Sequence, residues 1–158
     1  MATLDHLVAD GKLKKYDPDL EHDEFPERHA YVAPEADAWI DAILRSAPHG
    51  RSLRLSPYRQ VEQLMFDFVI GRPLVYDAQR KKLNPVGLHV WELKTHDVRL
   101  IGWFPRKRHF IIVCGRLKTE LLKASLYAPC INLVTMFRNT LDLDPPKTIT
   151  GVRHDDVL

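Results

Sequence analysis

Residues 88–118, LHVWELKTHDVRLIGWFPRKRHFIIVCGRLK, constrain the fold of this chain more than any other stretch. Three runs rich in β-branched and aromatic residues predict three strands, at Leu88–Lys94, Val98–Phe104 and His109–Cys114. The polar links between them have three and four residues. Links this short cannot bring the chain back parallel to itself, so the three strands are expected to form an antiparallel meander.

The meander is strongly basic. It carries seven Lys or Arg residues against two acids, Glu92 and Asp97, although the net charge of the whole chain is only +2. By contrast, the stretch Asp17–Glu27 contains six acids and no Lys or Arg. This asymmetry favours a nucleic-acid-binding surface together with an acidic segment. The alternative is that these are two solvated faces of opposite sign.

The composition points to an ordinary globular protein. A chain of 158 residues with 45% hydrophobic residues is long enough for one domain with its own core. The two cysteines, Cys114 and Cys130, lie in apolar runs and are expected to be small core residues. No signal peptide, membrane span or metal-ligand spacing is visible, so we expect a cytoplasmic protein without cofactor or metal.

Three helices are indicated by proline and capping signals. Pro34 and Pro57, the latter after Ser56, begin two helices before the meander, and Pro129 begins a third after it. Apolar residues at helical spacing predict the buried side of each helix. They are Ala36, Trp39, Ile40, Ile43 and Leu44 in the first; Val61, Leu64, Met65 and Phe68 in the second; and Cys130, Leu133, Val134, Phe137 and Leu141 in the third.

The predicted order is strand Arg28–Val32, two helices, the meander, a helix and a tail, which is an α+β fold on a small, mainly antiparallel sheet. The two helices are expected to cover one face and to leave the other free for a partner. Residues 51–55 are expected to form a linker or a short strand-like piece between the helices, and residues 72–87 a loop with a basic centre. The predicted organisation is an N-terminal arm at 1–26, a domain at 27–146 and a polar tail at 147–158.

Several motifs, in order, resemble the RelE/ParE toxin superfamily, and in particular its HigB-like, phage-associated branch. The helix ending VEQLMFDFVIGRPL is followed by a basic loop, then by GLHVWELK, similar to the family's "gLyELR". DVRLIGWF and HFIIVCGRLKT resemble its next two strands. The resemblance implies a RelE-like fold, a helix-turn-helix antitoxin as partner, and cleavage of mRNA in the ribosomal A site without a metal. Its ParE-type members poison DNA gyrase instead.

The resemblance also implies site residues. Lys94 stands in place of the family's Arg in "ELR", Arg99 takes the strand Arg, and Lys118 the last Lys of "KKt". The late catalytic residue of the family has no clear equivalent here, and the candidates are Tyr127, Arg153 and His154.

Metal-free RNA cleavage requires a base, an acid and cations around the phosphate. Lys94, crowded by other cations, is a phosphate contact or the base, and Arg99 and Lys118 are phosphate contacts. His96 and His109, at the ends of predicted strands, are acid–base candidates or else turn residues. The residues expected to bind RNA by charge are Arg106, Lys107, Arg108, Arg116 and Lys82.

The sequence leaves three further questions open. Trp91 and Trp103 could stack on bases or belong to the core. The acidic stretch Asp17–Glu27 could fold over the basic sheet and mimic phosphate. Beside the mRNA endonuclease, the candidate functions are a non-catalytic inhibitor of a host protein such as gyrase, a phage host-takeover factor, and a plain RNA-binding module.

Overall fold

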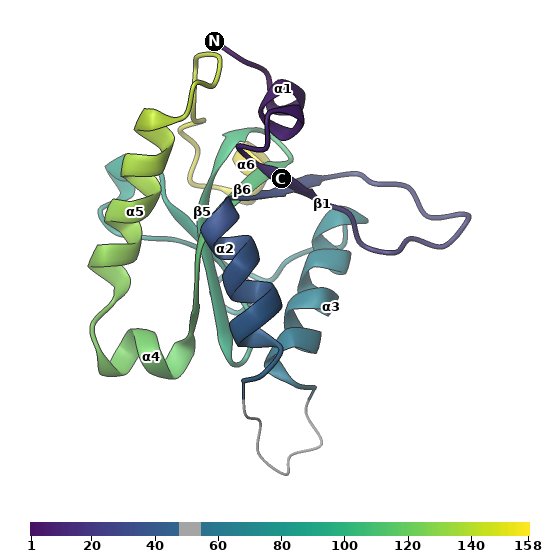
Figure 1. Ribbon diagram of the computed structural model, residues 1–158, viewed down its shortest axis with the longest axis vertical. Helices are drawn as coiled ribbons and strands as arrows, with labels where there is room; N and C mark the ends of the chain where they lie inside the picture. The colour runs from purple at the N-terminus through teal and green to yellow at the C-terminus, as the bar shows by residue number, and fades with distance from the viewer. Residues whose placement is uncertain (48–54) are drawn as a thin grey trace.

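A single mixed sheet forms the centre of the molecule (Figure 1), as seen in a computed structural model that describes residues 1–47 and 55–158. Within these residues the sheet has six strands in the order β1-β2-β6-β5-β4-β3. The α+β class predicted from the sequence is confirmed. The strands are β1 (Lys14–Tyr16), β2 (His29–Val32), β3 (Arg80–Lys82), β4 (Trp91–Lys94), β5 (Val98–Arg106) and β6 (His109–Leu117).

The meander is confirmed, with shifted bounds. β4 pairs antiparallel with β5, and β5 with β6. β4 begins at Trp91, three residues later than predicted, because the chain first makes a 3-10 turn, η2 (Val86–Leu88), and His89 then takes a left-handed conformation. β5 and β6 run two or three residues beyond their predicted ends, with irregular pairing near Gly102. A side chain at Gly102 would collide with the backbone of Ile111, so this position needs glycine.

Three features of the sheet do not follow from the sequence patterns. Lys14–Tyr16 of the predicted arm forms β1 and pairs with β2. Part of the predicted basic loop, Arg80–Lys82, forms β3 and pairs with β4. The first strand, β2, lies parallel to β6. A parallel strand requires a long crossover, which here runs from β2 through the helices and the meander to β6.

One face of the sheet is covered by the two predicted helices. The first is α2 (Pro34–Ala38) continuing into a π-helical segment, η1 (Trp39–Leu44), and the second is α3 (Pro57–Val69). All four residues predicted for the stripe of α3 are buried. Ile43, predicted to be buried, is instead 53% exposed, because the wider π-helical turn shifts it out of the apolar stripe. Residues 51–54 of the predicted linker lie outside the described residues.

The prediction that the other face is free is wrong. This face is covered by α1 (Leu4–Ala9), α4 (Lys118–Lys123) and α5 (Tyr127–Thr140), which close a second apolar core over Ile101, Trp103 and Ile111. Most of the apolar residues predicted for α5 contribute to this core, but Leu133 is 40% exposed. The sheet is therefore sandwiched between two helical layers (Figure 1).

The chain ends are part of this packing. Leu4 and Leu7 of α1 are buried in the second core, and β1 extends the sheet beside β2. At the other end, α6 (His154–Val157) leads to Val157 and Leu158, which are buried in the first core. Of the predicted N-terminal arm, the acidic loop of residues 17–28 between β1 and β2 extends away from the body (Figure 1).

The tryptophans belong to the cores. Trp91 packs edge-on against Phe104 in the first core, and Trp103 packs against Phe137 in the second. Both are at most 1% exposed, so neither presents a face to a base. The two cysteines are also core residues, as predicted, with their sulfurs 2.7 Å apart between β6 and α5.

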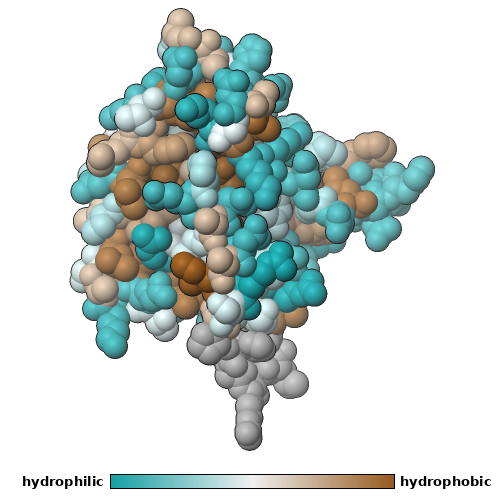
Figure 2. Space-filling view, viewed as in Figure 1, coloured by the Kyte–Doolittle hydropathy of each residue, from teal (hydrophilic) through white to brown (hydrophobic). Residues whose placement is uncertain are grey.

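Apolar side chains gather on the outer surface of α4 and α5 (Figure 2). They include Leu122, Leu133 and Met136, each at least 40% exposed. Among the helices of the described residues, none has the length and apolar character needed to cross a bilayer.

Candidate functional site

A row of basic residues crosses the meander at the end where β4 turns into β5. Lys94 on β4 is the direct cross-strand partner of Arg99 on β5, which is in turn the partner of Arg116 on β6. Direct partners point to the same face of a sheet, so the sequence brings these three side chains together on the α5 face. Lys118 begins α4 at the same end, and its backbone N–H donates to the carbonyl of Asp97 at 2.8 Å.

A buried carboxylate lies beside this row. Glu92 is two residues before Lys94 and therefore on the same face, with only 2% of its surface exposed. Its Oε2 accepts a hydrogen bond of 2.9 Å from the hydroxyl of Tyr127, the first residue of α5. The nearest cations are the Lys94 ammonium at 3.8 Å and Arg99 Nε at 4.0 Å. We call Glu92, Lys94, Arg99, Arg116 and Tyr127 the polar cluster.

Burial controls the protonation of the acid and the phenol. The pKa of Glu92 is raised above its ordinary value because burial penalises the carboxylate more than Tyr127, Lys94 and Arg99 stabilise it. Burial, with the neighbouring Glu92 charge, also raises the pKa of Tyr127 to about 12. A buried carboxyl with a raised pKa next to fixed cations is typical of general acid–base sites, although structural ion pairs can produce it too.

Lys94 is surrounded differently from the sequence-based expectation. Its ammonium contacts the carboxylate of Asp77 at 3.3 Å in addition to that of Glu92. The expected crowding by other cations, which supported Lys94 as the base, is therefore not what its contacts show. Glu92 is the better candidate for that role because its carboxylate is the buried, weakly acidic group.

Arg99 and Arg116 are held in place by backbone carbonyls. The Nη1 of Arg99 donates to the carbonyls of Thr95 at 2.6 Å and Val98 at 3.0 Å, which ties the guanidinium to the β4–β5 turn. Its buried Nε has no hydrogen-bond partner among the described residues. Arg116 Nη1 donates to the carbonyl of Gly115 at 2.6 Å. Arg99 is 8% exposed, whereas Lys118 lies on the surface.

A shallow cavity of about 280 Å³ borders the cluster between the β4–β5 turn and α3. Lys94, Thr95 and His96 line one side of it, and Gln60, Gln63 and Gln79 belong to the other sides. His96 is exposed and its Nδ1 lies 2.8 Å from Asp97 Oδ1. Of the predicted catalytic residues, Lys94, Arg99, Lys118 and His96 thus lie at one end of the meander.

Arg116, predicted to bind RNA, also lies in this row, but the other predicted site residues lie elsewhere. The opposite end of the β5–β6 hairpin, about 26 Å away for a rise over eight residues, carries Arg106, Lys107, Arg108 and His109. Lys82 is buried on the other face of the sheet, where its ammonium donates to the carbonyl of Gly151 at 2.8 Å. His109 therefore cannot act together with Arg99, and Lys82 has no surface for RNA.

His109 forms a pair with His29. Its ring lies 4.8 Å from that of His29, where β2 and β6 begin side by side, and Tyr31 stacks on it at 6.3 Å. Burial lowers the pKa of both imidazoles, and nearby cations, above all Arg106 for His109 and Lys15 for His29, lower it further. Protonating both rings would place two like charges in contact.

This pair predicts an acid-sensitive fold. The folded protein binds these protons less readily than the unfolded chain does. The neutral pair therefore makes its whole contribution to the free energy of unfolding above pH 6.5, and this contribution is lost as the pH falls through the lowered pKa values. The free energy of unfolding, measured in urea at about pH 7.5 and about pH 5, should decrease less on acidification for His29→Gln than for the native chain. His22→Gln, on the exposed loop, is the control and should leave the loss unchanged; equal losses in all three proteins would contradict the prediction.

Glu92, Tyr127 and Asp77 are not among the site residues that the sequence singles out as the catalytic or RNA-binding set. Glu92 could have been found as a single acid inside the apolar run HVWEL, at the spacing that places it beside Lys94. Tyr127 is suggested only as a candidate for the late catalytic residue. Its contact with Glu92 joins positions 35 residues apart, which no local pattern reveals.

Comparison with models of known protein families, with curated proteins and with solved structures finds no match for this chain. Within the described residues, no three His, Cys, Asp or Glu side chains are grouped to hold a metal ion.

Proposed function

We propose that this protein is an endoribonuclease of the toxin type, cutting mRNA at the polar cluster without a metal. The observation that carries the proposal is the buried Glu92–Tyr127 pair beside the cross-strand row Lys94, Arg99 and Arg116. The motif resemblance to RelE- and HigB-like toxins supports the same function. In this proposal the substrate is mRNA on the ribosome, and the protein acts in the cytoplasm.

The cluster holds groups for each part of the reaction. Glu92 removes the proton from the ribose 2′-OH, whose oxygen forms a bond to phosphorus while the bond to the 5′-oxygen breaks. Arg99 and Arg116 stabilise the charge that develops on the phosphate oxygens. The Lys94 or Lys118 ammonium donates the proton to the leaving 5′-oxygen. The products are a 2′,3′-cyclic phosphate and a 5′-hydroxyl.

Substrate entry must change the contacts of Glu92. In the structure, Tyr127 occupies one oxygen of the carboxylate, and α4 and α5 cover the face on which it lies. The 2′-OH has to replace the Tyr127 hydroxyl as the group that donates to Glu92. In this proposal a nucleotide approaches through the cavity that Lys94 and His96 line.

A protein inhibitor is part of the proposal. The exposed apolar residues Leu122, Leu133 and Met136 lie on the two helices that cover the cluster. An antitoxin that covers this apolar surface would hold α4 and α5 closed over Glu92. A helix-turn-helix protein encoded beside the gene is the expected partner.

The test is inducible expression followed by mapping of the 5′ ends of cellular mRNA. New 5′-hydroxyl ends that appear on translated messages and depend on Glu92 support the proposal. Cleavage of a message bound to a programmed ribosome, and its loss when the nucleotide at the cut carries a 2′-deoxy ribose, tests the 2′-OH mechanism separately. Growth arrest without any new RNA ends would contradict the nuclease function.

A non-catalytic role is the second candidate, and the burial of the cluster favours it. Glu92 is 2% exposed and Arg99 is 8% exposed, and both are already bonded within the protein. Such a cluster could serve only to hold β4, β5 and α5 together, while the surface inhibits a host protein such as gyrase. Toxicity that survives Glu92→Gln would favour this function.

Phosphate contact by Lys118 predicts a salt-dependent effect. Lys118 is exposed at the end of the row, so Lys118→Ala should weaken RNA binding without unfolding the protein. The slope of log affinity against log salt should fall by about 0.7 for one lost single-strand phosphate contact. Fluorescence titrations at several salt concentrations measure it, with Lys12→Ala on the exposed N-terminal turn as control. An identical slope for both variants would exclude Lys118 as a phosphate contact.

A further inference from the structure

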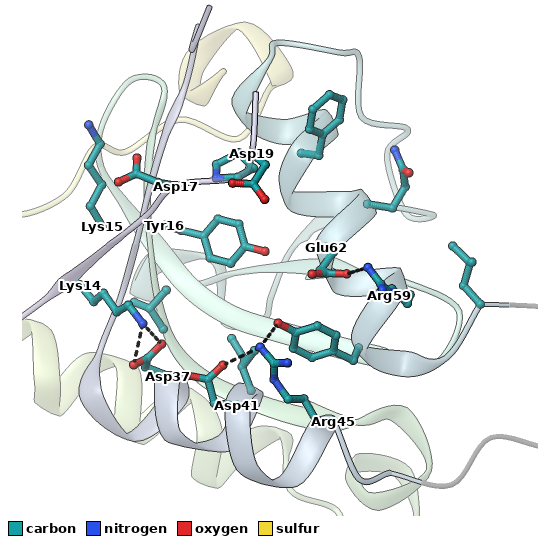
Figure 3. Close-up of a pocket in the computed structure, with 17 residues that line it drawn as sticks. Lys14, Lys15, Tyr16, Asp17, Asp19, Asp37, Asp41, Arg45, Arg59 and Glu62 are labelled. Carbon is teal, nitrogen blue, oxygen red and sulfur yellow. Dashed lines mark hydrogen bonds and ion pairs between the residues drawn. The ribbon is translucent and has the colours of Figure 1, made fainter. Parts of the chain in front are cut away.

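The largest cavity described lies on the opposite side of the sheet from the polar cluster. It measures about 790 Å³, within the range of small-ligand sites, and lies between β1 with the start of the acidic loop, the helix η1 and α3 (Figure 3). Tyr16 of β1 and Val32 of β2 form part of its floor, and both pack with the first core. The acidic loop thus contributes to this cavity and does not fold over the basic end of the meander, which the sequence left as a possibility.

Most of the basic side chains around the cavity are already neutralised by its own walls. Lys14 pairs with Asp37 at 3.2 Å, Arg45 with Asp41 at 3.7 Å, and Arg59 with Glu62 at 2.7 Å. Among the described residues, one other basic residue lines it, Lys15, which points away from Tyr16 (Figure 3).

Two further carboxylates, Asp17 and Asp19, line the cavity from the loop. Within residues 1–47 and 55–158, neither Asp17 nor Asp19 makes a hydrogen bond or an ion pair. The carboxylate of Asp19 lies above the Tyr16 ring, across from Glu62 (Figure 3). After the wall pairs are counted, the cavity retains an excess of negative charge at this point.

The Tyr16 hydroxyl in this cavity has negatively charged neighbours. Its hydroxyl points toward Glu62 (Figure 3), and burial followed by the nearby Tyr58, Glu62 and Asp41 raises its pKa to about 12. Burial, the largest cause, disfavours charge of either sign, but the carboxylates of Glu62 and Asp41 also disfavour a negative charge here and attract a positive one. The Arg45 guanidinium already lies over the Tyr58 ring at 4.2 Å, which shows that these aromatic walls accept a cation.

We propose that this cavity binds an organic cation, with an ammonium or guanidinium group held against the ring and hydroxyl of Tyr16, between Asp19 and Oε1 of Glu62, the carboxylate oxygen that Arg59 does not contact. The apolar floor, which includes Val32, Ile40 and Phe66, accommodates the alkyl part of such a ligand. Two sources share this chemistry: a free polyamine and an arginine side chain of a peptide. The site is separate from the proposed nuclease cluster and does not depend on it.

Titration calorimetry of the full chain tests the proposal, with spermidine and, separately, a short arginine-containing peptide as probes. Saturable binding of spermidine alone identifies a free polyamine, and binding of the peptide alone identifies an arginine side chain. Asp19→Asn and Glu62→Gln should each weaken the binding about tenfold or more, because each removes one of the two facing charges. Tyr16→Phe keeps the ring and should weaken it less.

Asp144→Asn is the matched control, since Asp144 is an exposed acid on the far side of the fold. It should bind the probe as tightly as the native chain when the ionic strength is matched. The proposal is overturned if neither probe saturates, or if Asp144→Asn weakens binding as much as Asp19→Asn does. It is equally overturned if Asp19→Asn and Glu62→Gln, shown to be folded by circular dichroism, bind unchanged.

Discussion

Replacing Glu92 by Gln is expected to lower RNA cleavage by about 100- to 10,000-fold, the usual contribution of a general base. The amide keeps the size of the side chain and can still accept the hydrogen bond from Tyr127, but it cannot take the 2′-OH proton. Single-turnover cleavage of a ribosome-bound message measures the loss. Glu35→Gln, on the exposed first turn of α2, is the control and should cleave at the native rate.

The same substitution is expected to stabilise the fold, most clearly at high pH. The raised pKa of Glu92 means that its stabilising contribution is present below the unfolded value near 4.5 and is lost as pH rises through the higher folded value. Glu92→Gln removes this loss, so its advantage in urea should grow with pH, and native cleavage should rise over the same range as the carboxylate ionises. A variant that loses activity together with stability at every pH would instead mark Glu92 as a structural residue.

The meander could be predicted because its information is local. Turn residues separate three runs of strand-forming residues, and the short links leave only the antiparallel arrangement. The exact register could not be predicted, because the turn is tighter than the three-residue link: the Thr95 N–H donates to the Val98 carbonyl at 3.0 Å, which places Lys94 opposite Arg99. Arg116 lies opposite Arg99 only because the β5–β6 pairing is irregular near Gly102 and near the hairpin end.

The second helical layer could not be predicted in the same way. The runs in β5 and β6 are apolar on both faces, which is the pattern of a strand covered on both sides, yet local signals place only two helices over the sheet. The missing cover comes from α1, α4 and α5, which approach from both ends of the chain. Leu4 and Leu7 form only a short apolar pattern in the sequence. The residues of β5 and β6 in the same core lie more than 90 positions away.

The residues of the candidate site could likewise be predicted only in part. Basic residues could be chosen by charge and by motif, and those near the β4–β5 turn do lie together. Charge alone could not separate them from Lys82, which the fold turns to the opposite face, or from the hairpin tip about 26 Å away. Nor could it find Glu92, because a carboxylate becomes a candidate base only when burial raises its pKa, and burial depends on the helix that carries Tyr127.

Replacing Arg99 separates the two proposed functions. Its guanidinium lies across from Lys94 and Arg116, and its Nε is the one nitrogen of the side chain that the described residues leave buried without a hydrogen-bond partner. The same Nε lies 4.0 Å from Glu92 Oε2, so the guanidinium is held beside the proposed base by charge and without a hydrogen bond. Arg99→Met keeps most of the volume and removes the charge, and should reduce cleavage about 100- to 1,000-fold.

Arg99→Lys is the sharper comparison because it keeps the charge but loses the planar fork. If Arg99 stabilises the phosphate through two directed hydrogen bonds, the lysine variant should recover RNA binding and little of the cleavage rate. Arg106→Met at the opposite hairpin end is the matched control and should leave the cleavage rate within about threefold, since it contributes at most a remote phosphate contact. If instead Arg99→Met unfolds at lower urea, through the lost bonds to Thr95 and Val98, while growth arrest persists in cells, the guanidinium only secures the turn and the toxic surface acts by binding.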